Sequence, residues 1–266
     1  MPKLLTADQR ERFEREGIAF PIPVMLVEEA AQYRAACDRL EADLDGKPRT
    51  IEVRQMHLHF PWAYRLATLP RVLDAVEDVL GPNLLVWATE LFAKHPRDAA
   101  VSIGWHRDQP YMGFDDPTPV TAWISLGSSS RENGCMQAIP EADRREKCAA
   151  GARPPKGPAP PESDAVDVVL RPGEMSLHDA YILHGSNPNL SDEKRVGFVV
   201  RFITPDMTPK HGRPPVLLAR GRDDRGHCEI VDGPSEADGA EALSQMKRSA
   251  AQHLDAMLEN LKVAGR

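Results

Sequence analysis

Short runs of aliphatic, β-branched and aromatic residues, separated by clusters of Gly, Pro, Asn and Asp, most limit what this chain can fold into. Five such runs lie at 84–92, 120–126, 166–170, 175–177 and 196–204. Runs of this length between turn-forming residues indicate β-strands. The 24 Pro and 18 Gly are also more than a helical bundle tolerates. The sequence therefore predicts a mainly β protein with many turns.

Helical patterns flank this β-rich stretch on both sides. Four segments have helical composition or apolar spacing, at 7–16, 27–44, 70–80 and 235–262. The segment 70–80 begins with Pro70 and ends before Gly81, as helices often do. The predicted fold class is therefore α+β, mainly β with flanking helices.

The chain length and the order of these segments predict a single domain. Its 266 residues are enough to enclose one substantial core. We expect one domain over 1–266, with a helical N-terminal part at 1–82, a β core at 83–205 and a C-terminal extension with a helix at 206–266. Residues 151–161 are rich in Pro and Gly and predict a mobile surface loop, either a lid or a simple insertion.

Charge and composition exclude several classes of partner. The net charge of −7 is spread along the chain, so no basic surface is predicted for nucleic acid. No window has the roughly 18 to 20 consecutive apolar residues of a membrane span, and the N-terminus lacks the pattern of a secretory signal. The four Cys form no C-x-x-C pair. We expect a cytoplasmic protein with reduced thiols.

The segment Trp105-His106-Arg107-Asp108 has the spacing of a metal-binding pair. On a strand, side chains two residues apart leave the same face, so His106 and Asp108 could reach one ion while Arg107 points away. Two imidazoles and one carboxylate on one face of an octahedron leave three positions open. That arrangement suits Fe(II) that must also bind a chelating co-substrate and dioxygen.

His-x-acid triplets also arise by chance, and this chain contains three. His253-Leu254-Asp255 lies in the C-terminal helical pattern, where residues two apart point in different directions. The only His after His227-Cys228-Glu229 is His253, and the only Arg beyond His253 is Arg266 at the chain end. Neither alternative has the downstream partners that the triplet at 106–108 has.

A third ligand and a carboxylate-binding residue follow further along the chain. His178 and His184 are both candidate ligands, and His184 is favoured because the turn sequence 187–192 and a strand beginning near Arg195 come after it. An Arg in that place can form a bidentate ion pair with a carboxylate. The joint spacing of these residues favours a metal site over a set of unrelated polar residues.

With these residues identified, the sequence resembles the phytanoyl-CoA dioxygenase family of Fe(II)/2-oxoglutarate oxygenases. The resemblance covers about residues 4–205. It depends on Leu5-Thr6 through Gly17, Leu80-Gly81-Pro82, Trp105-His106-Arg107-Asp108, Thr121-Ala122-Trp123, Glu132-Asn133-Gly134-Cys135-Met136 with Ile139-Pro140, Pro172-Gly173-Glu174, and His184-Gly185-Ser186 with Asn189 and Arg195. One departure is Glu141-Ala142-Asp143, where the family usually has Gly-Ser-His.

The resemblance implies a double-stranded β-helix, a cupin-like jelly roll whose mouth holds the metal. It implies that His106, Asp108 and His184 bind Fe(II) as the catalytic centre. It further implies that Arg195 and Ser186 hold the 2-oxoglutarate carboxylate. Thr89 and Trp123 then occupy positions that often line the co-substrate pocket.

The implied reaction uses O2 and 2-oxoglutarate to oxidise a small molecule, with release of succinate and CO2. In halogenating relatives a small residue replaces the carboxylate ligand. Because Asp108 fills that place, the resemblance implies a hydroxylase or a related oxidase and no halogenase. A CoA thioester finds little support in an acidic chain, so a natural product, amino acid or phosphonate is favoured as the substrate class.

Four residues are candidates for the substrate pocket. The segment 56–62 is dense in aromatic and imidazole groups, so His57 and His59 are placed either in a wall over the mouth or in a packing segment. Tyr111 is a candidate wall residue just past the metal motif. Arg201 lies six residues after Arg195 on the same strand face, where it binds an anionic substrate or pairs with an internal acid.

Two other functional classes fit the same ligands. One is a jelly-roll binding protein with a structural metal, which predicts no affinity for 2-oxoglutarate. The other is a zinc hydrolase, since two His and a carboxylate also suit zinc. The carboxylate-binding place of Arg195 argues against both, and the sequence does not predict an oligomeric state.

Overall fold

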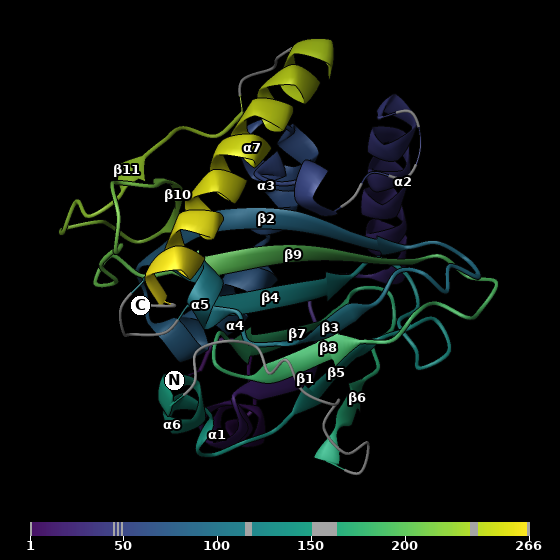
Figure 1. Ribbon diagram of the computed structural model, residues 1–266, viewed down its shortest axis with the longest axis horizontal. Helices are drawn as coiled ribbons and strands as arrows, with labels where there is room; N and C mark the ends of the chain where they lie inside the picture. The colour runs from purple at the N-terminus through teal and green to yellow at the C-terminus, as the bar shows by residue number, and fades with distance from the viewer. Residues whose placement is uncertain are drawn as a thin grey trace.

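The predicted strands assemble into two sheets that face each other (Figure 1). The computed structural model describes residues 2–44, 46, 48, 50–114, 119–150, 164–234 and 239–264. The larger sheet has seven strands in the order β1 (Ile18–Pro23), β7 (Glu174–Asp179), β4 (Val120–Ser125), β9 (Arg195–Ile203), β2 (Leu84–Lys94), β10 (Pro215–Arg220) and β11 (Glu229–Ile230). The smaller has four, β3 (Ile103–His106), β8 (Leu183–Ser186), β5 (Met136–Ile139) and β6 (Val166–Val168). This arrangement confirms the predicted jelly roll.

Helices cover the larger sheet and one end of the sandwich. They are α1 (Ala7–Glu16), α2 (Val27–Asp43), α3 (Pro61–Ala67), α4 (Pro70–Leu80), α5 (Gln109–Met112), α6 (Arg144–Ala150) and α7 (Gly239–Ala264), with short 3-10 turns η1 (Thr50–Glu52) and η2 (Met56–Leu58). The four predicted helices correspond to α1, α2, α4 and α7. In α1 both hydrogen bonds of a capping box form between Thr6 and Gln9, and Gly17 ends the helix in the left-handed conformation.

Strand β9 lies near the middle of the larger sheet and is buried on both faces. Its even-numbered apolar side chains join the main core cluster together with residues of α2, α3 and α4. Its odd-numbered side chains face the smaller sheet, where Arg195, Val199 and Arg201 line a cavity. The alternation of a strand therefore places two cations in the interior of the sandwich.

Two segments differ from their predicted roles. Residues 21–23, predicted as an extended connection, form the end of β1, and the two Pro are tolerated because β1 is an edge strand. Residues 56–62, considered for a wall over the mouth, form η2 and the start of α3. Met56, Phe60 and Trp62 pack into the main core cluster, which agrees with the alternative prediction of a packing segment. The predicted loop at 151–161 lies outside the described residues.

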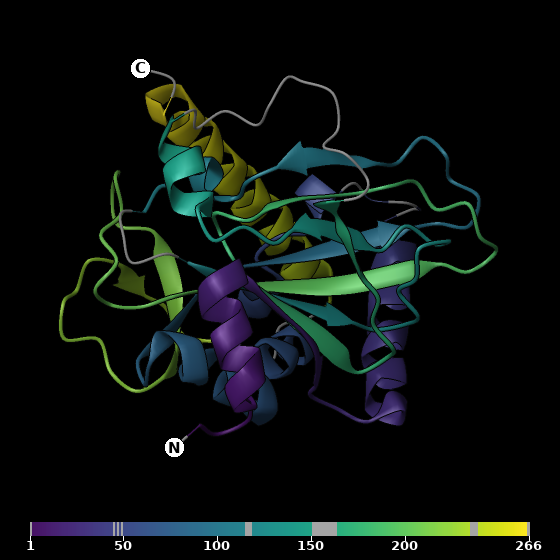
Figure 2. The same ribbon diagram turned by 90° about the horizontal axis from the view of Figure 1, so that it is seen from below.

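In Figure 2, α7 is yellow, α3 and α4 are blue, and α1 and α2 are purple. Helix α7 reaches the main core cluster through Met246 and a cavity beside the smaller sheet through Met257. It contacts α5 and η1, so it closes the space beside the smaller sheet. No helix among the described residues is long and apolar enough to cross a membrane.

Candidate active site

Three side chains from the smaller sheet and the turn that follows it converge at one point. His106 ends β3 and pairs directly with His184 of the antiparallel strand β8. The ligand atoms of His106, Asp108 and His184 all lie within 4.8 Å of one another. Nε2 of His106 is 3.6 Å from Oδ1 of Asp108. Two imidazoles and a carboxylate at this spacing fit a divalent ion such as Fe(II).

Asp108 reaches this point by a route that differs from the predicted one. The prediction placed His106 and Asp108 two residues apart on one strand, but β3 ends at His106. Asp108 has helical backbone angles, φ −75° and ψ −31°, and precedes the short helix α5. The two residues meet because the chain turns at the strand end. Arg107 points away, as predicted, and pairs with Glu141 at 2.8 Å.

Backbone carbonyls orient both imidazoles. Nδ1 of His106 donates to the carbonyl of Gly104 at 2.8 Å, and Nδ1 of His184 donates to that of Ile182 at 3.1 Å. Each ring then carries its proton on Nδ1, which leaves the Nε2 lone pair for a metal. Burial and the charge of His106 hold the pKa of His184 well below its usual value, so His184 is neutral and ready to bind.

The other predicted candidate, His178 on β7, stands beside the three ligands. Its ring centre is 5.0 Å from that of His184, and its Nε2 is 4.0 Å from Oδ2 of Asp108. Burial lowers the pKa of His178 to about 4, so the ring is neutral near pH 7. His178 does not belong to the group of three whose ligand atoms meet.

Arg201 pairs with two internal acids. Its Nη1 donates to Asp108 Oδ2 at 2.5 Å and to Thr121 Oγ1 at 3.3 Å. Its Nε and Nη2 donate to Glu90 Oε2 at 3.1 and 2.8 Å. Arg54 approaches Glu90 from the other side, with an N–O distance of 2.8 Å. Of the two predicted roles for Arg201, the internal ion pair is the one that the structure contains.

The ion pair between Asp108 and Arg201 shifts the pKa values of both groups. Burial favours the neutral form of Asp108, but the charge of Arg201 outweighs it and holds the pKa of Asp108 well below its usual range. Burial also disfavours charge on Arg201, yet the two carboxylates raise its pKa above the ordinary value. Both groups are therefore ionised in the buried site.

Arg195 lines the same cavity but has no acidic partner among the described residues. It is 2% exposed, and its guanidinium carbon lies 5.2 Å from the ring centre of Trp123. Nη1 donates to the carbonyl of Gly134, while Nε has no hydrogen-bond partner among the described residues. Burial lowers the pKa of Arg195 to about 10 because no carboxylate offsets it there. A buried guanidinium of this kind fits the carboxylate of a ligand.

Lys94 is a second buried cation at this end, and sequence reasoning missed it. Its Nζ donates to Ser186 Oγ at 2.6 Å, to Gly134 O at 3.2 Å and to the carbonyl of Asn187. Burial and the nearby charge of Arg195 lower the pKa of Lys94 to about 7. Ser186 accepts from Lys94, so its own hydroxyl proton remains available for a ligand oxygen.

The structure places Thr89, His57 and His59 away from this cavity. Thr89 alternates with Glu90 on β2, so its side chain faces the N-terminal helices, where its hydroxyl is 3.0 Å from Nδ1 of His57. His57 is fully buried there. His59 lies 2.8 Å from the hydroxyl of Ser249 on α7. None of the three lines the cavity that contains Arg195 and the three ligand residues.

The mouth of the site is a cavity of about 410 Å³ between the smaller sheet, β2 and α7. Tyr111 lines it, as predicted, and its ring centre is 6.4 Å from that of His106. Met257 of α7 lines the opposite wall. Asn260 of α7 donates to the carbonyl of Tyr111 at 3.2 Å, so α7 holds the turn that follows the metal motif.

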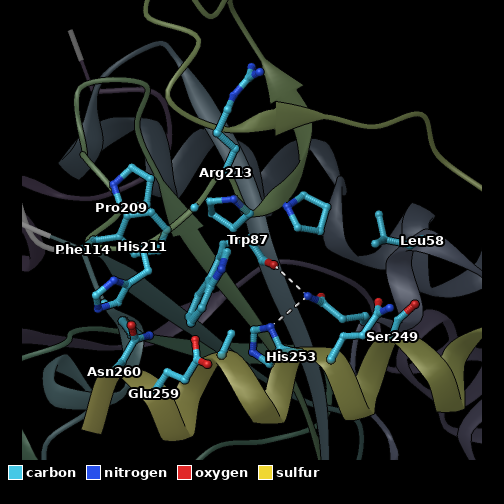
Figure 3. A pocket seen from close by; sticks show the side chains of 18 residues that line it. Leu58, Trp87, Phe114, Pro209, His211, Arg213, Ser249, His253, Glu259 and Asn260 are labelled. Carbon is cyan, nitrogen blue, oxygen red and sulfur yellow. Dashed lines mark hydrogen bonds between the residues drawn. The ribbon is translucent and has the colours of Figure 1, made fainter. Parts of the chain in front are cut away.

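A separate cavity of about 350 Å³ lies on the other side of this contact, and it contains none of the three ligand residues (Figure 3). His253 of α7 stands in its wall with its ring centre 4.8 Å from that of Trp87. Nδ1 of His253 is 3.1 Å from the amide nitrogen of Gln55. The triplet beginning at His253 is helical, as predicted, and within the described ranges it joins no group that could hold a metal ion.

Comparison with known proteins agrees with this geometry. The family model for phytanoyl-CoA dioxygenase (PhyH) matches residues 13–197. A probable alpha-ketoglutarate-dependent hypophosphite dioxygenase of Stutzerimonas stutzeri is 26% identical over 171 residues. That match spans 60% of this chain and 59% of the relative, which is less than two thirds of its length.

Solved structures share the fold. The apo structure of a non-heme monooxygenase, ThoJ, is 31% identical, has a TM-score of 0.82 and matches over 96% of this chain and 99% of its own. CytC3 with Fe(II) and alpha-ketoglutarate is 23% identical with a TM-score of 0.67, over 87% of this chain and 94% of its own. The second likeness shows the fold alone.

Proposed function

The chain belongs to the phytanoyl-CoA dioxygenase family, and from that premise we propose that it is a non-haem Fe(II)/2-oxoglutarate-dependent dioxygenase. We propose that it hydroxylates a small molecule and releases succinate and CO2. The observation on which this depends is one cavity that holds three converging ligand residues and a buried Arg195 without an acidic partner. The relatives named for alpha-ketoglutarate support the same co-substrate.

The chain supplies ligands, orientation and a dry interior. His106, Asp108 and His184 would hold the iron, which supplies the oxidising chemistry with O2 and 2-oxoglutarate when bound. Arg195 binds the far carboxylate of 2-oxoglutarate, and Ser186 and Lys94 support it. Trp123 packs against Arg195 and fixes the plane of its guanidinium. Buried groups fixed in advance bind and orient the co-substrate at low entropic cost.

Hydroxylation is proposed over halogenation because a carboxylate occupies the third ligand position. Asp108 is ionised, buried and held by Arg201, so it leaves no room for a halide in its place. The ThoJ structures, described as those of a non-heme monooxygenase, support oxygen insertion. The substrate enters the mouth between Tyr111 and Met257.

We also propose that residues 1–266 work as one unit. The helices α2–α4 pack on the outer face of the sheet that presents Arg195 and Arg201, while α7 forms part of the mouth. The N-terminal and C-terminal parts are therefore both needed to shape one site.

Calorimetry of 2-oxoglutarate binding tests this function. With Ni²⁺ as an inert substitute for iron, the wild-type protein is expected to bind 2-oxoglutarate. His106→Ala is expected to abolish that binding, and Arg195→Met is expected to weaken it roughly a hundredfold. A structural metal site or a zinc hydrolase predicts metal uptake without 2-oxoglutarate affinity, so that result would contradict the proposal. Anaerobic loading with Fe(II) and 2-oxoglutarate, followed by a screen for succinate release with candidate substrates under oxygen, then identifies the substrate.

A further inference from the structure

The two oxygens of Asp108 have different surroundings. Oδ1 faces His106, with 3.6 Å to its Nε2. Oδ2 accepts a hydrogen bond from Nη1 of Arg201 at 2.5 Å and lies 4.0 Å from the neighbouring His178. Only Oδ1 therefore belongs to the space that the ligand residues share, while Oδ2 is engaged by a cation.

Arg201 is itself fixed from two further directions. Nε and Nη2 both donate to Glu90 Oε2, at 3.1 and 2.8 Å, and Nη1 also reaches Thr121. Glu90 is fully buried, and Arg54 holds its other oxygen at 2.8 Å. The planar guanidinium thus spans two carboxylates with different edges, which a single ammonium group cannot do.

We infer that Arg201 is a positioning residue that engages Oδ2 of Asp108 and so fixes Asp108 as a ligand through one oxygen. This inference rests on the proposed metal-binding function. A carboxylate that chelated through both oxygens would occupy a fourth coordination position. Only two would then remain, too few for a chelating 2-oxoglutarate together with dioxygen. The ion pair therefore preserves the open positions that the proposed reaction needs.

The chain offers a matched pair of variants for the test. Arg201→Lys keeps the positive charge but loses the fork that joins Glu90 to Asp108. Arg54→Lys changes the other buried guanidinium that pairs with Glu90, and Arg54 forms no ion pair with Asp108 in the described part of the chain. Both variants retain net charge, so a difference between them reports the contact with Asp108 and not the loss of a cation. Thermal unfolding of the metal-free variants reports any shared loss of stability.

Two measurements are made on each variant. Calorimetry with Ni²⁺ is expected to show roughly 10- to 100-fold weaker metal binding for Arg201→Lys, the usual effect of losing a group that orients a ligand. Arg54→Lys is expected to stay within about threefold of wild type, because the groups that orient its ligands are intact. The visible absorption of the Co²⁺ complex is expected to change for Arg201→Lys alone, because its coordination changes.

Equal changes in both variants, or no change in either, would overturn the inference while leaving metal binding by the wild type intact. If Arg201→Lys does not fold, X-ray absorption of the Co²⁺-loaded wild type decides the matter. A carboxylate carbon at the distance of one-oxygen binding supports the inference, and one at the shorter distance of two-oxygen chelation overturns it. A wild-type protein that takes up no metal would instead refute the proposed function, and the inference with it.

Discussion

Arg195 and Arg201 lie on the same face of β9, six residues apart, and both are buried, but their surroundings are opposite. Arg201 contacts two carboxylates, which raise its pKa above the ordinary value. Arg195 contacts a backbone carbonyl and an indole ring, and burial lowers its pKa to about 10. The protein itself neutralises Arg201, whereas no carboxylate among the described residues balances the charge of Arg195.

The contrast shows that the partners of a buried charged residue indicate its role. An ion pair inside the protein stabilises the fold or orients a neighbour, since both partners are present before any ligand arrives. An unpaired buried cation lowers stability in the free protein, and the protein recovers that free energy when an anion binds. We therefore propose that the same residue type in the same strand serves positioning at one end and ligand binding at the other.

The largest expected difference between the Arg195 and Arg201 ends of β9 is in the free energy of unfolding. Arg201→Met leaves Glu90 and Asp108 buried with one fewer cation, which is expected to lower the free energy of unfolding by about 3–5 kcal/mol. Chemical denaturation of the metal-free protein measures it. A loss below about 1 kcal/mol would mean that the ion pair is no stronger than an exposed one.

The variant Arg195→Met tests the Arg195 end of β9. It removes an unpaired buried charge, so the metal-free protein is expected to be as stable as wild type or more stable. The affinity for 2-oxoglutarate in the presence of Ni²⁺ is expected to fall by about 3 kcal/mol, roughly a hundredfold. Destabilisation comparable to that of Arg201→Met would erase the proposed distinction.

Gly197, between the two cations, tests how tightly the Arg195 end is packed. A Cβ added there would lie 2.0 Å from Cζ2 of Trp123, so Gly197→Ala must displace the ring that stacks on Arg195. We expect a loss of about 1–3 kcal/mol in stability and weaker 2-oxoglutarate binding by calorimetry. Unchanged binding in a folded variant would show that the indole does not orient the guanidinium.

The pH dependence of 2-oxoglutarate binding tests Lys94. Its pKa in the free protein is about 7, below the usual value for Lys, and a bound carboxylate favours the charged form. Binding therefore takes up a proton above pH 7, and affinity is expected to fall by up to about tenfold per pH unit there. In Lys94→Met this slope is expected to disappear. A slope that persists in the variant would assign it to another group.

Thr89→Val has the smallest expected effect and serves as a control outside the site. It removes the hydroxyl that lies 3.0 Å from Nδ1 of His57 on the outer face of the sheet. We expect about 1–2 kcal/mol of destabilisation and no change in the affinity for 2-oxoglutarate. A marked loss of affinity would restore Thr89 to the predicted co-substrate pocket.

Apolar patterns predicted the strands and the principal helices, and motif spacing predicted the three residues that converge, because both are local properties. The jelly roll was implied by the family resemblance. The sequence did not predict Lys94, which ends a strand and is buried only through contacts with Gly134 and Ser186, distant in the chain. Thr89 was placed in the pocket by resemblance, yet one step of strand alternation turns it to the other face. The sequence also left two roles open for Arg201, because its pairing with internal acids depends on tertiary contacts.

Helix α7 supplies Met257 to the mouth and lies beyond the stretch of 13–197 that the family model matches. The proposed iron ligands and the proposed substrate-facing wall thus lie in separate stretches of chain. Substitutions along one side of this helix can retune which molecules are admitted while the oxidation chemistry stays as it is.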